Sequence, residues 1–203
     1  MKKHQVIVIH GGDNFETYEE YIQFLKDFPV DLDRLRTKGW KDTLQDRLGN
    51  DFEVLQPEMP NSFNARYSEW KIWFDKHVPL LEPEVVLVGH SLGGIFLAKY
   101  LAENDFQKKI AGTFLVAAPF DDKNADYSLM DFVLPNSLSK FGKQGGKIFL
   151  YHSKDDDGVP FVDLDKYKKA IPSAKTIIFT DRGHFRQPEF PELVADIKAL
   201  FNS

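Results

Sequence analysis

Short apolar, β-rich runs alternate with amphipathic helical patterns along almost the whole chain. The predicted strands are Val6–Ile9, Phe52–Leu55, Val85–Val88, Ile110–Ala117, Lys147–His152 and Thr176–Phe179. The predicted helices, with apolar residues spaced by three and four, are Asp33–Leu48, Ser62–Val78, Gly93–Asn104, Val162–Ala170 and Pro191–Phe201. Strands joined through helices lie parallel, because each crossover carries the chain back to the same end of the sheet. The pattern therefore predicts an α/β fold, a three-layer α/β/α sandwich with a mostly parallel sheet of about six strands.

Length and composition exclude several classes of protein. A chain of 203 residues with 42% hydrophobic content suits one packed core, so we expect a single domain over residues 1–203. The net charge of −5 and the scattered basic residues argue against a nucleic-acid partner. No apolar run approaches the ~20 residues of a membrane span, so no membrane association is expected. The absence of cysteine and of a signal-peptide pattern predicts a cytoplasmic protein without disulfides.

The segment Gly89-His90-Ser91-Leu92-Gly93 has the pattern G-x-S-x-G. It follows the apolar run 84–88 directly and precedes a helical stretch, which is the strand-turn-helix context of a nucleophile elbow. Glycine is expected on both sides of the serine because a Cβ there would collide with neighbouring backbone. Ser91 is therefore the predicted nucleophile. The alternative is a glycine-rich turn in which Ser91 only caps the helix.

A serine hydroxyl is a poor nucleophile near neutral pH and needs a histidine base within hydrogen-bond reach. His184 is the best candidate, because it follows a turn after the last predicted strand, where the chain order Ser, acid, His places the base. The alternative is a histidine on a surface loop. His10 and His90 lie within glycine motifs and are expected to orient the backbone by hydrogen bonding.

Several carboxylates can orient the imidazole of His184. Asp156 is preferred, because it stands three residues before Val159-Pro160 and the proline favours an extended backbone that fixes the loop. The alternatives are its neighbours Asp155 and Asp157 and, further away, Asp121 and Asp122. A calcium loop beginning at Ser153 fails, because Leu164 stands where a glutamate is needed. No pair of histidines has metal-ligand spacing on one helix face, so no metal site is expected.

An acyl-transfer site also needs two N–H donors for the developing oxyanion. The N–H of Leu92 directly follows the nucleophile, and the N–H of Gly12, in the turn after the first strand, is the predicted second donor. Asp13 is the alternative to Gly12. A phosphate-binding turn at His10-Gly11-Gly12 is excluded because G-x-G-x-x-G is absent.

Two aromatic-rich stretches are candidate covers for this site. They are residues 13–32 and residues 120–146, and the second is long for a connection and is predicted to form a short lid. The alternative is that both only pack on the sheet.

Together these motifs resemble the α/β-hydrolase superfamily over the whole chain, specifically the small serine hydrolases similar to retinoblastoma-binding protein nine and its bacterial relatives. The resemblance rests on His10-Gly11-Gly12, Gly39-Trp40, Leu44, Leu48, Gln56–Pro60, Trp70, Gly89–Gly94, Asp156-x-x-Val159-Pro160 and Gly183-His184-Phe185. It implies a triad of Ser91, Asp156 and His184, no cofactor, and a minimal version of the fold with little or no cap.

The predicted function is hydrolysis of small carboxylic esters through an acyl-enzyme, so the expected partner is a small ester-type substrate. Thioesterase, lactonase and small-amidase activities are alternatives, because the same tetrahedral chemistry serves them all. A further alternative is a non-catalytic interaction protein that keeps the hydrolase fold. The sequence indicates no particular protein partner.

Overall fold

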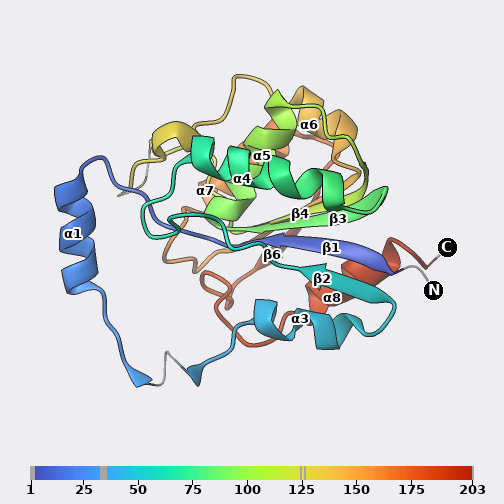
Figure 1. Ribbon diagram of the computed structural model, residues 1–203, viewed down its shortest axis with the longest axis horizontal. Helices are drawn as coiled ribbons and strands as arrows, with labels where there is room; N and C mark the ends of the chain where they lie inside the picture. The colour runs from blue at the N-terminus through green and yellow to red at the C-terminus, as the bar shows by residue number, and fades with distance from the viewer. Residues whose placement is uncertain (1–2, 33–35, 124, 126, 203) are drawn as a thin grey trace.

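The computed structural model describes residues 3–32, 36–123, 125 and 127–202 (Figure 1). It confirms the predicted α/β fold: the described strands form one six-stranded sheet in the order β2-β1-β3-β4-β5-β6, and every neighbouring pair is parallel. The strands are β1 His4–Ile9, β2 Phe52–Leu55, β3 Glu84–His90, β4 Lys109–Val116, β5 Lys147–Ser153 and β6 Lys175–Phe179. Each lies within two residues of its predicted bounds, because runs buried on both faces stand out in the sequence.

Helices cover both faces of the sheet (Figure 1). One face packs against α4 (Tyr67–His77), α5 (Leu92–Glu103), α6 (Ser139–Gln144) and α7 (Val162–Ala170), and the other against α3 (Trp40–Leu48) and α8 (Pro191–Ala199). Alternate residues of β1 enter the two cores, with Ile7 and Ile9 on the first face and Val6 and Val8 on the second. In the part of the chain that the structure describes, no helix has the length and hydropathy of a membrane-crossing segment.

The order of the strands fixes where a ligand can bind. The chain passes from β1 outward to β2 and then returns to the other side of β1 with β3, so the direction of winding reverses between β1 and β3. Ile9 pairs with Gly89, and the loop that begins at His10 therefore leaves the sheet beside Ser91. In open α/β sheets the ligand crevice lies at such a reversal, beyond the carboxyl ends of the strands.

Two predicted helices begin later than expected. Helix α3 begins at Trp40 rather than Asp33: residues 33–35 lie outside the described residues, Gly39 is extended, and the Asp42 carboxylate accepts a hydrogen bond from the Gly39 N–H. Helix α4 begins at Tyr67 rather than Ser62. Its first N–H groups donate to the carboxylate of Asp131, at 2.7 Å from Tyr67 N. This cap comes from a segment 64 residues away and carries no local signal.

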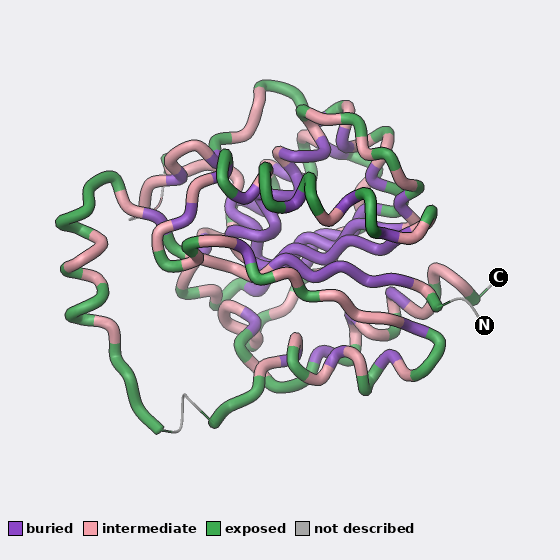
Figure 2. The backbone as a smooth tube through the Cα atoms, viewed as in Figure 1, coloured by how far each residue is buried: buried purple, intermediate pink, exposed green. Residues whose placement is uncertain are grey.

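The two aromatic-rich stretches have different surroundings. Helix α1 (Tyr18–Asp27) lies in the first, begins with a capping box of Thr17 and Glu20, and has no buried residue. Figures 1 and 2 show it standing apart from the sandwich, beyond the carboxyl ends of the strands. The second stretch contains α6 and a short 3₁₀ turn at Met130–Phe132, and Phe132 and Phe141 are fully buried. A lid function for residues 120–146 stays a prediction; residues 124 and 126 lie outside the described residues.

Candidate active site

Ser91 occupies a strained turn between β3 and α5. Its φ of 55° and ψ of −123° are unfavourable for a residue with a side chain. The turn is tight because Cβ atoms at Gly89 and Gly93 would strike the carbonyl oxygens of Gly93 and Ile9. Although Ser91 precedes the helix, its hydroxyl caps no backbone N–H. The hydroxyl is therefore not used for helix capping, the alternative role that the sequence left open.

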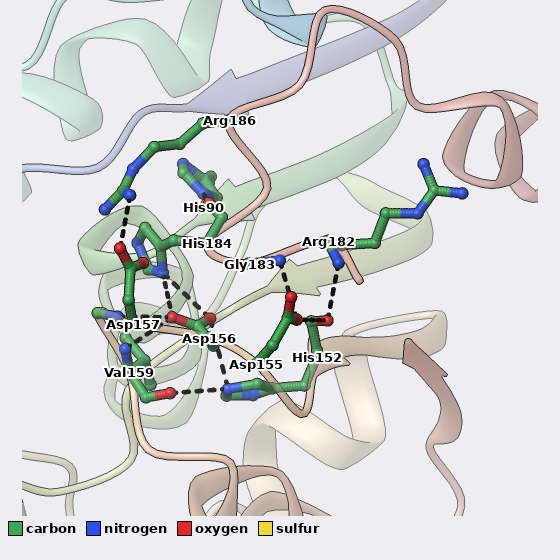
Figure 3. A network of polar contacts seen from close by, with 12 residues as sticks. His90, His152, Asp155, Asp156, Asp157, Val159, Arg182, Gly183, His184 and Arg186 are labelled. Atoms are coloured by element: carbon green, nitrogen blue, oxygen red, sulfur yellow. Dashed lines mark hydrogen bonds and ion pairs between the residues drawn. The ribbon is translucent and has the colours of Figure 1, made fainter. Parts of the chain in front are cut away.

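Asp156 and His184 come together from the loops after β5 and β6 (Figure 3). Nδ1 of His184 lies 2.9 Å from Oδ1 and 3.1 Å from Oδ2 of Asp156. The aspartate side chain is completely buried, and its Oδ1 also accepts hydrogen bonds from the N–H groups of Gly158 and Val159 at 2.8 and 2.9 Å. These donors compensate the buried charge and fix the carboxylate. Gly158 leaves space for the imidazole, since a Cβ there would lie 3.1 Å from His184 Nδ1.

The neighbouring aspartates contact other parts of the loop that carries His184 (Figure 3). Asp155 accepts a hydrogen bond from the Gly183 N–H at 3.0 Å, and Asp157 pairs with Arg186 on the surface. The two more distant alternatives are engaged elsewhere: Asp121 pairs with Lys166, and Asp122 accepts from the Leu129 N–H. Of the five aspartates considered from the sequence, the structure brings Asp156 to the imidazole.

Three further histidines stabilise the surrounding backbone. Nε2 of His10 accepts from the Met59 N–H and its Nδ1 lies 2.6 Å from the Gly11 carbonyl oxygen. Nε2 of His90 lies 2.9 Å from the carbonyl oxygen of His184, and Nε2 of buried His152 lies 3.1 Å from that of Val159. Contacts to the backbone confirm the expectation for His10 and His90. Burial lowers the pKa of all three imidazoles, and for His90 the cationic Lys41 lowers the pKa further.

The predicted oxyanion donors lie beside the serine. Leu92 is the first residue of α5, so its N–H has no acceptor within the helix. Gly12 is packed so closely that a Cβ would lie 2.6 Å from the carbonyl oxygen of Ser62. That same oxygen accepts the N–H of Asp13 at 2.8 Å, so the alternative donor is already engaged. Gly12 as the second oxyanion donor stays a prediction.

Ser91 and His184 line one cavity of about 270 Å³. Leu92 and Gly12 also line it, and its apolar wall includes Phe15, Phe24 and Leu129. An adjoining hollow of about 680 Å³ shares Asn14, Phe15, Phe24 and Tyr127 with this cavity. Within the described ranges no three histidine or carboxylate side chains lie together in a way that could hold a metal ion. The charged residues Asp13 and Arg186 line the same cavity.

A parallel sheet in this order, with a serine on a strained turn between β3 and the following helix, defines the α/β-hydrolase class of proteins. A family model described as Serine hydrolase matches residues 33–190, and the chain belongs to this family. The chain is 27% identical to rat serine hydrolase RBBP9 over 174 residues, which cover 81% of this chain and 87% of the relative.

Solved structures with low sequence identity share the fold. The ydeN gene product of Bacillus subtilis superposes with a TM-score of 0.79 at 20% identity, covering 99% of this chain and all of that one. The 2-hydroxy-6-oxo-6-phenylhexa-2,4-dienoate hydrolase of Rhodococcus sp. strain RHA1 gives a TM-score of 0.66 at 13% identity, covering 99% and 91%. These matches confirm the resemblance to small serine hydrolases of the α/β-hydrolase superfamily that the sequence motifs indicated.

Stability is expected to fall when the pH is lowered from 7.5 to 5.5. His10, His90 and His152 have lowered pKa values in the folded protein, so below about pH 6.5 the unfolded chain binds more protons. Each such proton changes the free energy of unfolding by ~1.4 kcal/mol per pH unit, and half-buried His10 contributes less than a full proton. Desolvation at the cavity rim raises the pKa of Asp13, which opposes this trend at lower pH. Urea unfolding at several pH values measures how the free energy of unfolding depends on pH.

The substitution His90→Gln removes one titrating group while keeping a donor near the position of Nε2. We expect the free energy of unfolding of this variant to depend less steeply on pH, by about the ~1.4 kcal/mol per pH unit that one proton contributes. An unfolding free energy that stays constant over this range would contradict the assignment of the three histidines as neutral.

Proposed function

We propose that this serine hydrolase cleaves small carboxylic esters through an acyl-enzyme with Ser91 as the nucleophile. The observation that carries the proposal is the pairing of buried Asp156 with His184 at the cavity that Ser91 lines. In the imidazole tautomer that fits this pairing, the Nδ1–H donates to Asp156 and the lone pair of Nε2 is free to accept the serine proton. His184 is the general base in this proposal and Asp156 orients it.

The reaction proceeds in two halves. The Ser91 oxygen attacks the ester carbonyl while its proton passes to His184 Nε2, and the N–H groups of Leu92 and Gly12 stabilise the oxyanion. The tetrahedral species collapses as the imidazolium gives its proton to the leaving alcohol, and the acyl group stays on Ser91. Water then attacks the acyl carbonyl with His184 again as the base, releasing the acid and the free serine.

The cavity wall supports a preference for short apolar acyl groups. Phe15, Phe24 and Leu129 can bury an acyl chain, and each buried methylene is worth ~0.8 kcal/mol, or about fourfold in kcat/KM. We therefore expect nitrophenyl butyrate, which has two more methylenes, to exceed nitrophenyl acetate by roughly 15-fold in kcat/KM. The nitrophenyl hemiester of succinate is the matched charged substrate, and it should be slower than the butyrate because its carboxylate is desolvated in the cavity.

Nitrophenol release under steady-state conditions measures these three rates. The variant Phe24→Ala should reduce the preference for butyrate over acetate, whereas Tyr18→Ala, on the same helix but 67% exposed, should preserve it. Fastest turnover of the succinate hemiester would contradict an apolar acyl site. Absence of turnover with all three esters would contradict the esterase function.

A further inference from the structure

The loop Gly183–Gln187, which carries His184, is held by donors that come from two elements far away in sequence. The structure assigns Trp40, at the start of α3, and His90, at the end of β3, as positioning residues that keep the imidazole of His184 directed into the cavity. This inference rests on the proposed function, in which His184 is the base.

Three hydrogen bonds connect these residues to successive parts of the loop. Nε2 of His90 lies 2.9 Å from the carbonyl oxygen of His184. The indole N–H of Trp40 donates to the carbonyl oxygen of Phe185 at 3.0 Å. The backbone N–H of Trp40 donates to the carbonyl oxygen of Gln187, also at 3.0 Å. Both side chains are buried, with Trp40 only 1% and His90 only 7% exposed, so water cannot readily replace them.

The imidazole of His90 is oriented as a donor toward the loop. Its Nδ1 lies 3.3 Å from the ammonium of Lys41, which can only donate, so Nδ1 is the acceptor and Nε2 carries the hydrogen. A neutral imidazole with this tautomer donates to the carbonyl oxygen of His184. The rings of His90 and His184 also lie close, with centroids 5.0 Å apart.

The loop needs such support because its backbone is strained. Gly183 has a φ of 49° and Phe185 a φ of 54°, and the second value is unfavourable for a residue with a large side chain. Before His184 the loop is held by Ser153, at the end of β5, which accepts from the Arg182 N–H, and by Asp155, in the loop after β5, which accepts from the Gly183 N–H. Beyond it, Trp40 and His90 hold the backbone, and the Phe185 side chain is buried among Trp40, Phe179 and Phe190. Both arms are therefore fixed, and His184 lies between them.

The test compares variants that remove a donor with a control that removes only packing. His90→Phe keeps a ring but loses the Nε2–H, and we expect kcat for nitrophenyl butyrate to fall 10- to 100-fold with KM within about twofold, because small misplacement of a catalytic base is costly. Trp40→Phe removes the indole N–H and should lower kcat about tenfold. His90→Gln restores a donor near the same position and should recover kcat to within about threefold of the wild type.

The control is Phe190→Leu, which removes part of a ring that packs against Trp40 and Phe185 but leaves both donors in place. Its kcat should stay within about threefold of the wild type even if its melting temperature falls as far as that of Trp40→Phe. Hydrogen exchange of the amides in residues 183–187 provides a readout independent of activity, and it should accelerate in Trp40→Phe and His90→Phe but not in Phe190→Leu.

Two results would overturn the assignment: equal losses of kcat in Phe190→Leu and Trp40→Phe, or exchange in residues 183–187 that the donor variants leave unchanged. If the wild type hydrolyses none of the esters, the proposed function fails on its own. The exchange measurement then still decides whether Trp40 and His90 hold the loop.

Discussion

Replacing Ser91 with alanine is expected to lower kcat for nitrophenyl butyrate by about 10⁶-fold, to the background of the folded protein. The hydroxyl is the group that forms the acyl-enzyme, and the imidazole alone has no nucleophile to activate. Folding should change little, because alanine meets the same backbone strain at a φ of 55° and the hydroxyl of Ser91 caps no N–H. Steady-state rates and a thermal melt of the two proteins measure the two effects.

Labelling with a fluorophosphonate provides a second measurement of the same variant. The wild type should be labelled at Ser91, identified by peptide mass spectrometry, and Ser91→Ala should not be labelled. The matched control is Ser137→Ala, which removes an exposed hydroxyl paired with Ser139 and should react as fast as the wild type. A Ser91→Ala protein that keeps its activity or its label would exclude Ser91 as the nucleophile.

Replacing Asp156 with asparagine is expected to lower kcat by about 10⁴-fold. The N–H groups of Gly158 and Val159 both donate to Oδ1, so the asparagine carbonyl oxygen should stay in that position. The amide NH₂ then takes the place of Oδ2, 3.1 Å from His184 Nδ1, and competes for this nitrogen with Oδ1, which lies 2.9 Å away. An imidazole that accepts at Nδ1 carries its hydrogen on Nε2 and cannot take the serine proton.

The neighbouring aspartate supplies the control for this substitution. Asp157→Asn weakens an exposed ion pair with Arg186, and we expect its kcat to stay within about threefold of the wild type. Asp121→Asn, remote from the imidazole and paired with Lys166, should behave similarly. A loss at Asp121 or Asp157 as large as that at Asp156 would reassign the carboxylate that orients His184.

The sequence predicted the sheet and the order of its elements, because strands such as Val85–Val88 are apolar throughout and show their burial locally. It did not predict where α4 begins, since the cap is Asp131, far along the chain. Helix α1 was not predicted as a helix. Its aromatic residues indicated a cover, and none of them is buried in the core.

For the site, the glycine spacing around Ser91 and the turn before His184 led to the prediction of both residues, and the structure places both at one cavity. The choice among Asp155, Asp156 and Asp157 depends on which side chain faces the imidazole, and adjacent carboxylates look equivalent in a sequence. The contact of Trp40 with the loop was not predicted, and His90 was predicted to bond to the backbone but not to this particular loop. The reason is related: their acceptors are backbone carbonyl oxygens, which every residue has. The available signal for Trp40 is the Gly39-Trp40 motif in the sequence.

Helix α1 contributes to the candidate site but not to the hydrophobic cores. Phe24 of this helix lines the wall where the acyl group would lie, yet the helix adds no residue to either hydrophobic core. Substitutions in it can therefore change which molecules are accepted without lowering the melting temperature of the body. In the proposed esterase we therefore expect that residues of α1 can vary and change substrate preference while the two cores stay intact.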